Sequence, residues 1–179
     1  SWAEESIYAL VERGVVKGTS ETTYSPANPV TRADFAILLV RAFGLTGSGD
    51  ESFADVPASA YYAKEVAIAK ENGIIDGIGN NRFAPEAPIK REDMMLILAR
   101  VLKRMDEPLS EADEAVLAQY VDGAQVSAYA RQAVAQLVGA QLVAGSNGSL
   151  NPQGKTSRAE VAVLLERILS NRESEEEAK

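Results

Sequence analysis

Three copies of one short segment constrain the fold of this chain more than any other feature. The copies occupy residues 29–45, 88–105 and 156–169. In each copy a polar residue is followed by an arginine, a small or acidic residue, an acid and then an apolar run with helical spacing. The arginines are Arg32, Arg91 and Arg158. The sequence therefore predicts three helices with the same start, each belonging to a repeated unit.

The residues before these arginines predict how the helices are capped. Thr31 precedes Asp34 by three residues and Ser157 precedes Glu160 by three, which is the spacing of a capping box. Lys90 stands at the same position in the second copy and has no acceptor, so we expect no side-chain cap there. A capped core helix explains these positions but does not explain the arginines.

An arginine in the first turn opposes the helix dipole, at a cost of about 0.3–1 kcal/mol when it is exposed. Two interpretations remain open. In the first, an anion binds at the helix start, where amide groups and a guanidinium suit a carboxylate or a phosphate. In the second, each arginine forms a salt bridge to a neighbouring unit. The first predicts solvent-facing arginines in concave grooves, and the second predicts arginines buried against carboxylates without an open cleft.

Aligned on these arginines, which are separated by 59 and 67 residues, the three units share further parts. Opening helices are expected at 2–13, 61–72 and 129–140, led by Trp2, Tyr61 and Tyr129. Gly14 and Gly73 follow two of these helices as C-terminal caps with positive φ, and because Gln141 stands in the third unit we expect that helix to end differently. Turns at 14–18, 73–77 and 141–145 and proline-containing loops complete each unit. No stretch predicts a strand long enough for a sheet, so the fold class is all-α.

The segments between units carry two further signals. An aromatic residue, any residue and an aspartate precede units two and three, at Phe53–Asp55 and at 120–122. Either this aspartate caps the following turn, or it accepts hydrogen bonds from a sugar hydroxyl in the arginine groove. Residues 46–52 are rich in Gly and Ser and predict a flexible linker. Residues 110–119 predict an inserted short helix capped at Ser110.

Composition excludes several functions. The net charge of −8 argues against non-specific nucleic-acid binding. The absence of Cys and His excludes thiol chemistry and His-ligated zinc, and the sequence predicts no metal and no cofactor. No apolar stretch is long enough to span a bilayer, and we expect no membrane insertion. The adjacent carboxylates, such as Glu92 with Asp93, diverge on a helix, so we expect no catalytic residues and no enzyme activity.

Together these parts resemble three S-layer homology modules in tandem. The resemblance implies helix–loop–helix repeats in a pseudo-threefold arrangement around a central three-helix bundle. We expect modules at 1–45, 53–106 and 120–171, a linker helix at 107–119 and an acidic tail at 172–179. The chain opens inside the pattern at Ser1, as expected of a trimmed piece, so the first module lacks its aromatic–x–Asp.

The resemblance also implies a function outside the cell. Such modules anchor exported proteins non-covalently to the secondary cell wall polymer of Gram-positive-type bacteria, which carries a pyruvate ketal on N-acetylmannosamine. The alternative is a structural module of a surface-layer lattice, with other surface-layer subunits as partners and the arginines in inter-module salt bridges.

Mapped onto this sequence, the resemblance implies three grooves. The residues of the first groove are Arg32, Gly18, Thr19, Ser20, Asp55 and Tyr61. Those of the second are Arg91, Lys90, Gly77, Asp122 and Tyr129. Those of the third are Arg158, Gly145, Ser146 and Trp2. Two departures from the family pattern matter, because Lys90 adds charge to the anion site and Glu92 is placed to neutralise Arg91. We expect the third groove, which lacks its aspartate, to bind most weakly.

Overall fold

The computed structural model describes residues 2–17 and 24–178. Within these ranges every regular element is a helix, and extended backbone is paired only in isolated bridges between single residues. The all-α prediction is confirmed. The α-helices are α1 (Glu4–Glu12), α2 (Arg32–Ala42), α3 (Ala63–Glu71), α4 (Arg91–Arg104), α5 (Arg131–Gly139) and α6 (Arg158–Glu177), and the 3-10 helices are η1 (Glu114–Gln119) and η2 (Gly123–Gln125). None of the described helices is both long and apolar enough to cross a membrane.

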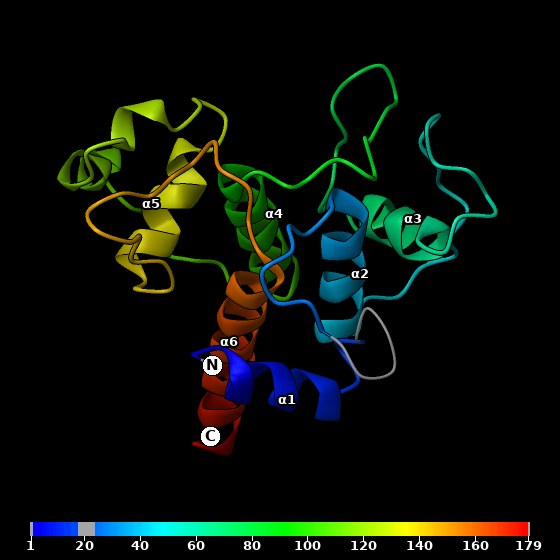
Figure 1. Cartoon of the computed structure of the whole chain (residues 1–179), viewed down its shortest axis with the longest axis horizontal. Helices are drawn as coiled ribbons and strands as arrows, with labels where there is room; N and C mark the ends of the chain where they lie inside the picture. The colour runs from blue at the N-terminus through cyan, green and yellow to red at the C-terminus, as the bar shows by residue number, and fades with distance from the viewer. Residues whose placement is uncertain (1, 18–23, 179) are drawn as a thin grey trace.

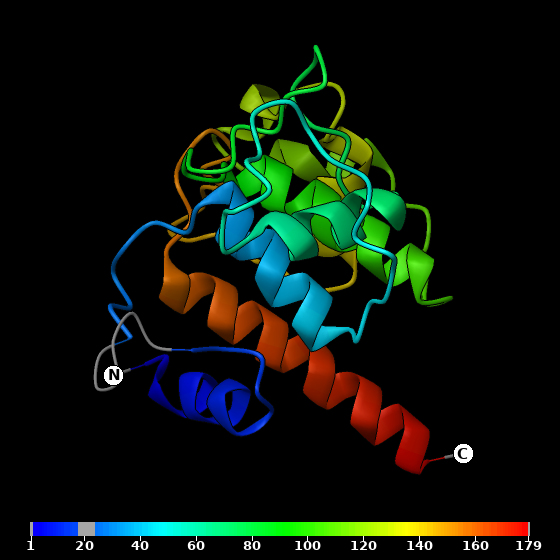
Figure 2. The same cartoon turned by 90° about the vertical axis from the view of Figure 1, so that its right-hand side faces the viewer.

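Each opening helix packs against the second helix of the preceding unit (Figure 1). Helix α3 lies on α2, α5 lies on α4, and α1 lies on α6. The last pair joins the two ends of the chain, and Figure 2 shows α1 running beside α6 from a second direction. Leu10 of α1 and Leu165 of α6 are both buried in the core, and Arg13 forms a salt bridge to Glu173 across this pair. The packing of α1 therefore closes the set of three units.

Backbone hydrogen bonds join the starts of α2, α4 and α6 in a closed cycle. The N–H of Val30 donates to the carbonyl of Thr156 (2.9 Å), that of Thr156 to Ile89 (3.3 Å), and that of Ile89 to Val30 (2.9 Å). Each residue stands two positions before the arginine of its unit, so the units meet at equivalent positions. This cycle supports an arrangement of the three units about a common centre.

The helix starts have the predicted caps. The hydroxyl of Thr31 accepts a hydrogen bond from the N–H of Asp34 at 3.0 Å. At α6 the capping box is complete, because the N–H of Ser157 donates to the Glu160 carboxylate (2.7 Å) and the N–H of Glu160 donates to the Ser157 hydroxyl (3.2 Å). The side chain of Lys90 makes no cap.

The prediction that the third opening helix ends differently is wrong. Gly14 and Gly73 both have φ of +69°, and Gln141 adopts nearly the same value, +58°. All three N–H groups donate to the carbonyl three residues earlier, at 2.9–3.0 Å. The shared turn therefore forces a glutamine into the left-handed region, although a side chain there costs about 1–2 kcal/mol.

Both predictions for the joining segments also need correction. The 46–52 segment is held against α3 rather than free, because one carboxylate oxygen of Glu71 accepts from the Ser48 hydroxyl (2.8 Å) and from the N–H of Asp50 (2.8 Å). The inserted helix is a 3-10 turn that begins at Glu114. Its cap is Asp113, which accepts from the N–H of Ala115 at 2.8 Å, and not Ser110.

Candidate functional site

The arginines at the starts of α2, α4 and α6 bind the loop of the next unit in the cycle. In each case Nε donates to the carbonyl of the apolar residue that anchors that loop. The bonds run from Arg32 to Phe83 (2.8 Å), from Arg91 to Leu150 (2.9 Å) and from Arg158 to Tyr24 (2.9 Å). The guanidiniums of Arg32 and Arg158 also lie over the rings of Phe83 and Tyr24, at 4.9 and 4.5 Å from the ring centres. The arginines thus connect units as well as line grooves.

Two of the arginines also face a carboxylate. Nη1 of Arg32 donates to Asp93 at 3.2 Å, and Nη1 of Arg91 donates to Glu160 at 2.7 Å. The Arg32 side chain is 10% exposed and that of Arg91 is 14% exposed. Burial lowers the pKa of Arg32, and Asp93 acts in the opposite direction. This is the environment expected of inter-module salt bridges, yet both arginines border open pockets.

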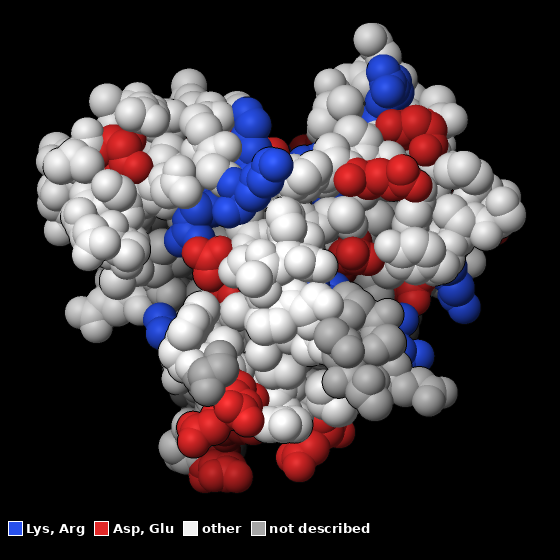
Figure 3. Space-filling model, viewed as in Figure 1, with Lys and Arg blue, Asp and Glu red and all other residues white. Residues whose placement is uncertain are grey.

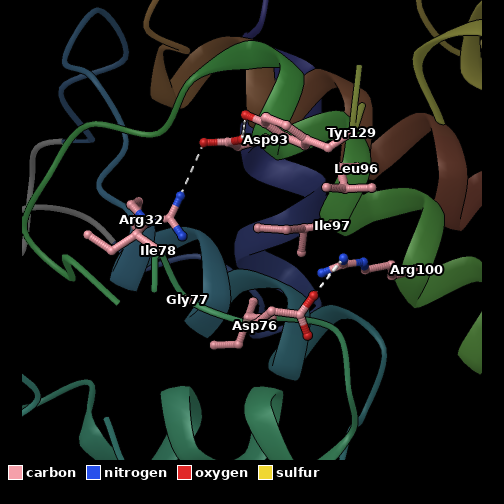
Figure 4. A pocket seen from close by; sticks show the side chains of 10 residues that line it. Arg32, Asp76, Gly77, Ile78, Asp93, Leu96, Ile97, Arg100 and Tyr129 are labelled. Atoms are coloured by element: carbon pink, nitrogen blue, oxygen red, sulfur yellow. Dashed lines mark hydrogen bonds and ion pairs between the residues drawn. The ribbon is translucent and has the colours of Figure 1, made fainter. Parts of the chain in front are cut away.

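The pocket at Arg32 has a volume of about 440 Å³. Figure 4 shows Arg32 and Asp93 on one side of it and the pair formed by Asp76 and Arg100 on the other. The turn around Gly77 contributes backbone to the wall, and Tyr129 closes the pocket beside Asp93. The hydroxyl of Tyr129 donates to Asp93 at 2.7 Å, so this aromatic side chain is fixed to the acid.

Two adjoining pockets border Arg91, with volumes of about 230 and 470 Å³. Both are also lined by Gly145 and Glu160. Trp2 lines the smaller pocket, and its side chain is largely exposed. Asp122 and Ser146 line the larger one. A guanidinium, an acid, a glycine turn and an aromatic residue therefore meet at Arg91 as they do at Arg32.

At the third arginine, Nη2 of Arg158 donates to the carbonyl of Lys17 at 3.1 Å.

The predicted groove residue Tyr61 is held to Asp34 by a hydrogen bond of 2.8 Å from its hydroxyl. Burial, together with that bond, raises the pKa of Tyr61 to about 12. Gly18, Thr19 and Ser20, which were predicted to bind beside Arg32, lie outside the described residues.

The structure groups the predicted residues differently from the sequence prediction. Gly77 and Tyr129 lie with Arg32 rather than with Arg91. The residues that lie with Arg91 rather than with Arg158 are Gly145, Ser146 and Trp2. Tyr61 bonds to Asp34 and does not line the Arg32 pocket. The reason is that each pocket combines parts of all three units. The Arg32 pocket takes its arginine from unit one, its glycine turn from unit two and its aromatic residue from unit three.

The aspartates of the aromatic–x–Asp segments are placed beside the predicted arginines, but their carboxylates hold loops. Asp55 accepts from the N–H groups of Phe83 and Ala84, both at 2.8 Å. Asp122 accepts in the same way from Leu150 (2.8 Å) and from the residue after it (2.7 Å). Burial acts to raise the pKa of Asp55, but these bonds lower it overall. The bonded N–H groups lie 28 and 29 residues later in the chain, so these contacts are not the predicted cap on the turn that directly follows each aspartate.

Glu92 does not neutralise Arg91, so that prediction is wrong. Its fully buried carboxylate accepts from the N–H and the hydroxyl of Ser127, both at 2.8 Å, and from the amide of Gln153 at 2.8 Å. The ammonium of Lys90 donates to the other end of the Gln153 amide, at 2.8 Å. Lys90 and Glu92 are therefore connected through Gln153.

Sequence reasoning missed two sets of groove residues. The first set is the acids two positions after each arginine: the sequence predicts Asp34 and Glu160 only as capping residues, and Asp93 only as one of two adjacent carboxylates that diverge on a helix. A second arginine stands nine residues after each first one, at 41, 100 and 167, and two of these line pockets. The signal that identifies both sets is their repetition at fixed spacing in all three units. Figure 3 shows basic side chains gathered beside the hollow between two lobes, while acidic side chains lie on both lobes as well as at the lower end of the molecule.

Comparison with known proteins shows relatives that share most of this chain. An endoglucanase of Bacillus sp. is 35% identical over 94% of the chain, a surface-layer 125 kDa protein of Lysinibacillus sphaericus is 30% identical over 95%, and an amylopullulanase of Thermoanaerobacterium thermosulfurigenes is 32% identical over 94%. The chain spans 18%, 14% and 9% of the lengths of these relatives. The enzyme names therefore describe proteins of which the matching region is a small part.

The S-layer homology domain model matches this chain three times, at residues 1–36, 52–95 and 119–162. These matches cover more than half of the sequence. Each match contains the opening helix and the arginine at the start of the second helix. The chain belongs to the S-layer homology domain family, whose members are non-catalytic modules that anchor surface-layer proteins and surface enzymes to the bacterial cell wall.

Proposed function

We propose that this chain anchors an exported protein to the cell wall by binding a pyruvylated secondary cell wall polymer in the grooves between units. The ligand group is a terminal N-acetylmannosamine that carries a pyruvate ketal. The observation that carries the proposal is the pair of pockets at Arg32 and Arg91, where a guanidinium, an acid, a glycine turn and an aromatic side chain meet.

Each part of these pockets suits one part of a pyruvylated sugar. A carboxylate is recognised by guanidinium N–H groups. Sugar hydroxyls donate to Asp93 or Glu160, and the apolar face of the ring packs on Tyr129 or Trp2. The volume of about 440 Å³ at Arg32 lies within the range of small-molecule sites.

The salt bridges to Asp93 and Glu160 favour the second candidate, a structural module of a surface-layer lattice. Both roles are compatible at one residue, because arginine has five N–H donors and the inter-unit contacts of Arg32 involve Nε and Nη1. The anchor account assigns the donors that face the pocket to the ligand carboxylate.

Sedimentation with purified cell walls tests the proposal. The walls are used intact and after mild acid treatment that removes the ketal. We expect the chain to sediment with intact walls only, and Arg91→Gln to weaken this binding while Arg104→Gln, an exposed position at the end of α4, leaves it unchanged. Equal binding to both wall preparations would exclude recognition of the ketal. Sedimentation of the chain without walls would support the lattice role.

A further inference from the structure

Two arginines at equivalent positions have different surroundings in the two pockets. Arg100 and Arg167 each stand nine residues after the first arginine of their unit and line the pockets at Arg32 and Arg91. Nη2 of Arg100 lies 2.7 Å from the carboxylate of Asp76, in the turn of unit two. In unit three Ala144 takes the place of Asp76, and Arg167 donates to the carbonyl of Leu142 at 3.2 Å.

The charges that line the two pockets differ as a result. At Arg32, two arginines face two aspartates, so the described lining is neutral. At Arg91, in the smaller pocket, Arg91 and Arg167 face a single carboxylate, Glu160. The described lining of that pocket therefore carries one net positive charge. Arg167 is exposed and forms no ion pair with any described residue, so its charge is available to a ligand.

From this difference we infer that Arg167 is a second anion-binding residue of the groove that contains Trp2. The groove takes a saccharide with two anionic groups, one at Arg91 and a second at Arg167. The second group is a carboxylate or a phosphate attached next to the ketal-bearing sugar. This inference rests on the proposed function, because it places the ketal carboxylate at Arg91 and the sugar ring against Trp2. The equivalent arginine in the Arg32 pocket is already neutralised by Asp76.

The position of Trp2 allows ligand binding in this groove to be measured separately from binding in the other grooves. It is the single tryptophan of the sequence, and its side chain is 71% exposed at the rim of the pocket. A sugar that packs on the indole changes its fluorescence, and binding at Arg32 or Arg158 does not contribute to that signal directly. Titration of Trp2 fluorescence therefore measures affinity in the Arg91 groove.

The experiment compares three glycosides of pyruvylated N-acetylmannosamine. The methyl glycoside carries one anionic group, while the 1-phosphate and the carboxymethyl glycoside carry two. We expect the 1-phosphate and the carboxymethyl glycoside each to bind about tenfold more tightly than the methyl glycoside, which is the effect of one additional charge-assisted contact at an exposed site. Arg167→Gln removes this preference, so that the three probes bind this variant with similar affinity. Arg100→Gln, the matched change in the other pocket, keeps the preference.

The outcomes separate this inference from the proposed function. A preference for both the 1-phosphate and the carboxymethyl glycoside identifies charge as the determinant, and a preference for the 1-phosphate alone identifies a phosphate group. Equal affinity for all three probes, unchanged by Arg167→Gln, overturns the role of Arg167 and leaves ketal binding intact. Failure of folded protein to bind any of the three probes overturns the proposed function and this inference together.

Discussion

The backbone N–H of Ser127 donates a 2.8 Å hydrogen bond to the carboxylate of Glu92, which is completely buried at the start of α4. Ser127 precedes α5, so this bond joins the second helix of unit two to the third unit. Ala33 and Ala159 stand at the positions equivalent to Glu92 in the other units. Units one and three therefore have no carboxylate at this position that could make the contact formed by Glu92.

We expect Glu92→Ala to lower the free energy of unfolding by about 2 kcal/mol, because it leaves the Ser127 N–H without its acceptor and removes the nearest acceptor of the Gln153 amide. Urea unfolding followed by circular dichroism measures this change. Glu86→Ala is the control, since Glu86 is exposed and should change stability by less than about 0.5 kcal/mol. A similar loss in both variants would show that the Glu92 contacts contribute nothing specific.

The same contacts predict a dependence on pH. Burial acts to raise the pKa of Glu92, but the hydrogen bonds from Ser127, Gln153 and Tyr129 lower it overall. The ionised carboxylate is therefore favoured by folding. Its contribution is fully present above the ordinary glutamate pKa of about 4.3 and is lost as the pH falls through the lowered pKa of the folded state. The stability difference between the native chain and Glu92→Ala should be constant from neutral pH to about 5 and shrink below about 4. A difference that grows in acid would contradict this account.

Thr156 lies in the cycle of backbone bonds at the centre, and its buried hydroxyl has no hydrogen-bond partner among the described residues. Valine has nearly the same shape without the hydroxyl, so Thr156→Val should stabilise the chain by about 1 kcal/mol. Val30→Thr places a hydroxyl at the equivalent position of unit one and should destabilise by a similar amount. Thermal unfolding of the two variants checks the prediction. It fails if Thr156→Val lowers the melting temperature.

Gln141 has a positive φ at the turn where units one and two use glycine. Gln141→Gly removes the steric conflict but adds freedom to the unfolded chain, so the expected net stabilisation is about 0.5–1 kcal/mol. The reverse change, Gly73→Gln, should destabilise by a comparable amount. Chemical denaturation of both variants measures the effect. No change in either would mean that the turn tolerates side chains without strain.

The features that could be predicted from the sequence are those that depend only on residues close together in the chain. The capped starts at Thr31 and Ser157 and the turn glycines follow from local backbone chemistry, and their repetition supports each assignment. The grouping of Arg32 with Gly77 and Tyr129 depends on which unit folds against which, and no local pattern contains that information. Gln141 shows the same limit, because tertiary packing imposed a turn that residue preference alone argued against.

Because Arg32 and Arg91 border different pockets, substitution of each should remove a different binding site. Arg32→Gln and Arg91→Gln should each remove one binding site for a pyruvylated sugar, because each guanidinium supplies the donors for one ligand carboxylate. Calorimetric stoichiometry of the single variants and the double variant checks this. Unfolding curves are the control, since both arginines also hold loops of the next unit. Unchanged stoichiometry in folded single variants would place the ligand elsewhere.

The most direct measurement is a calorimetric titration of the native chain with a pyruvylated N-acetylmannosamine glycoside, beside the same sugar without the ketal. We expect the chain to bind the pyruvylated sugar alone, with a stoichiometry equal to the number of grooves that bind. Equal binding of both sugars, or no binding of either by folded protein, would contradict the assignment of the arginine grooves to the ketal carboxylate.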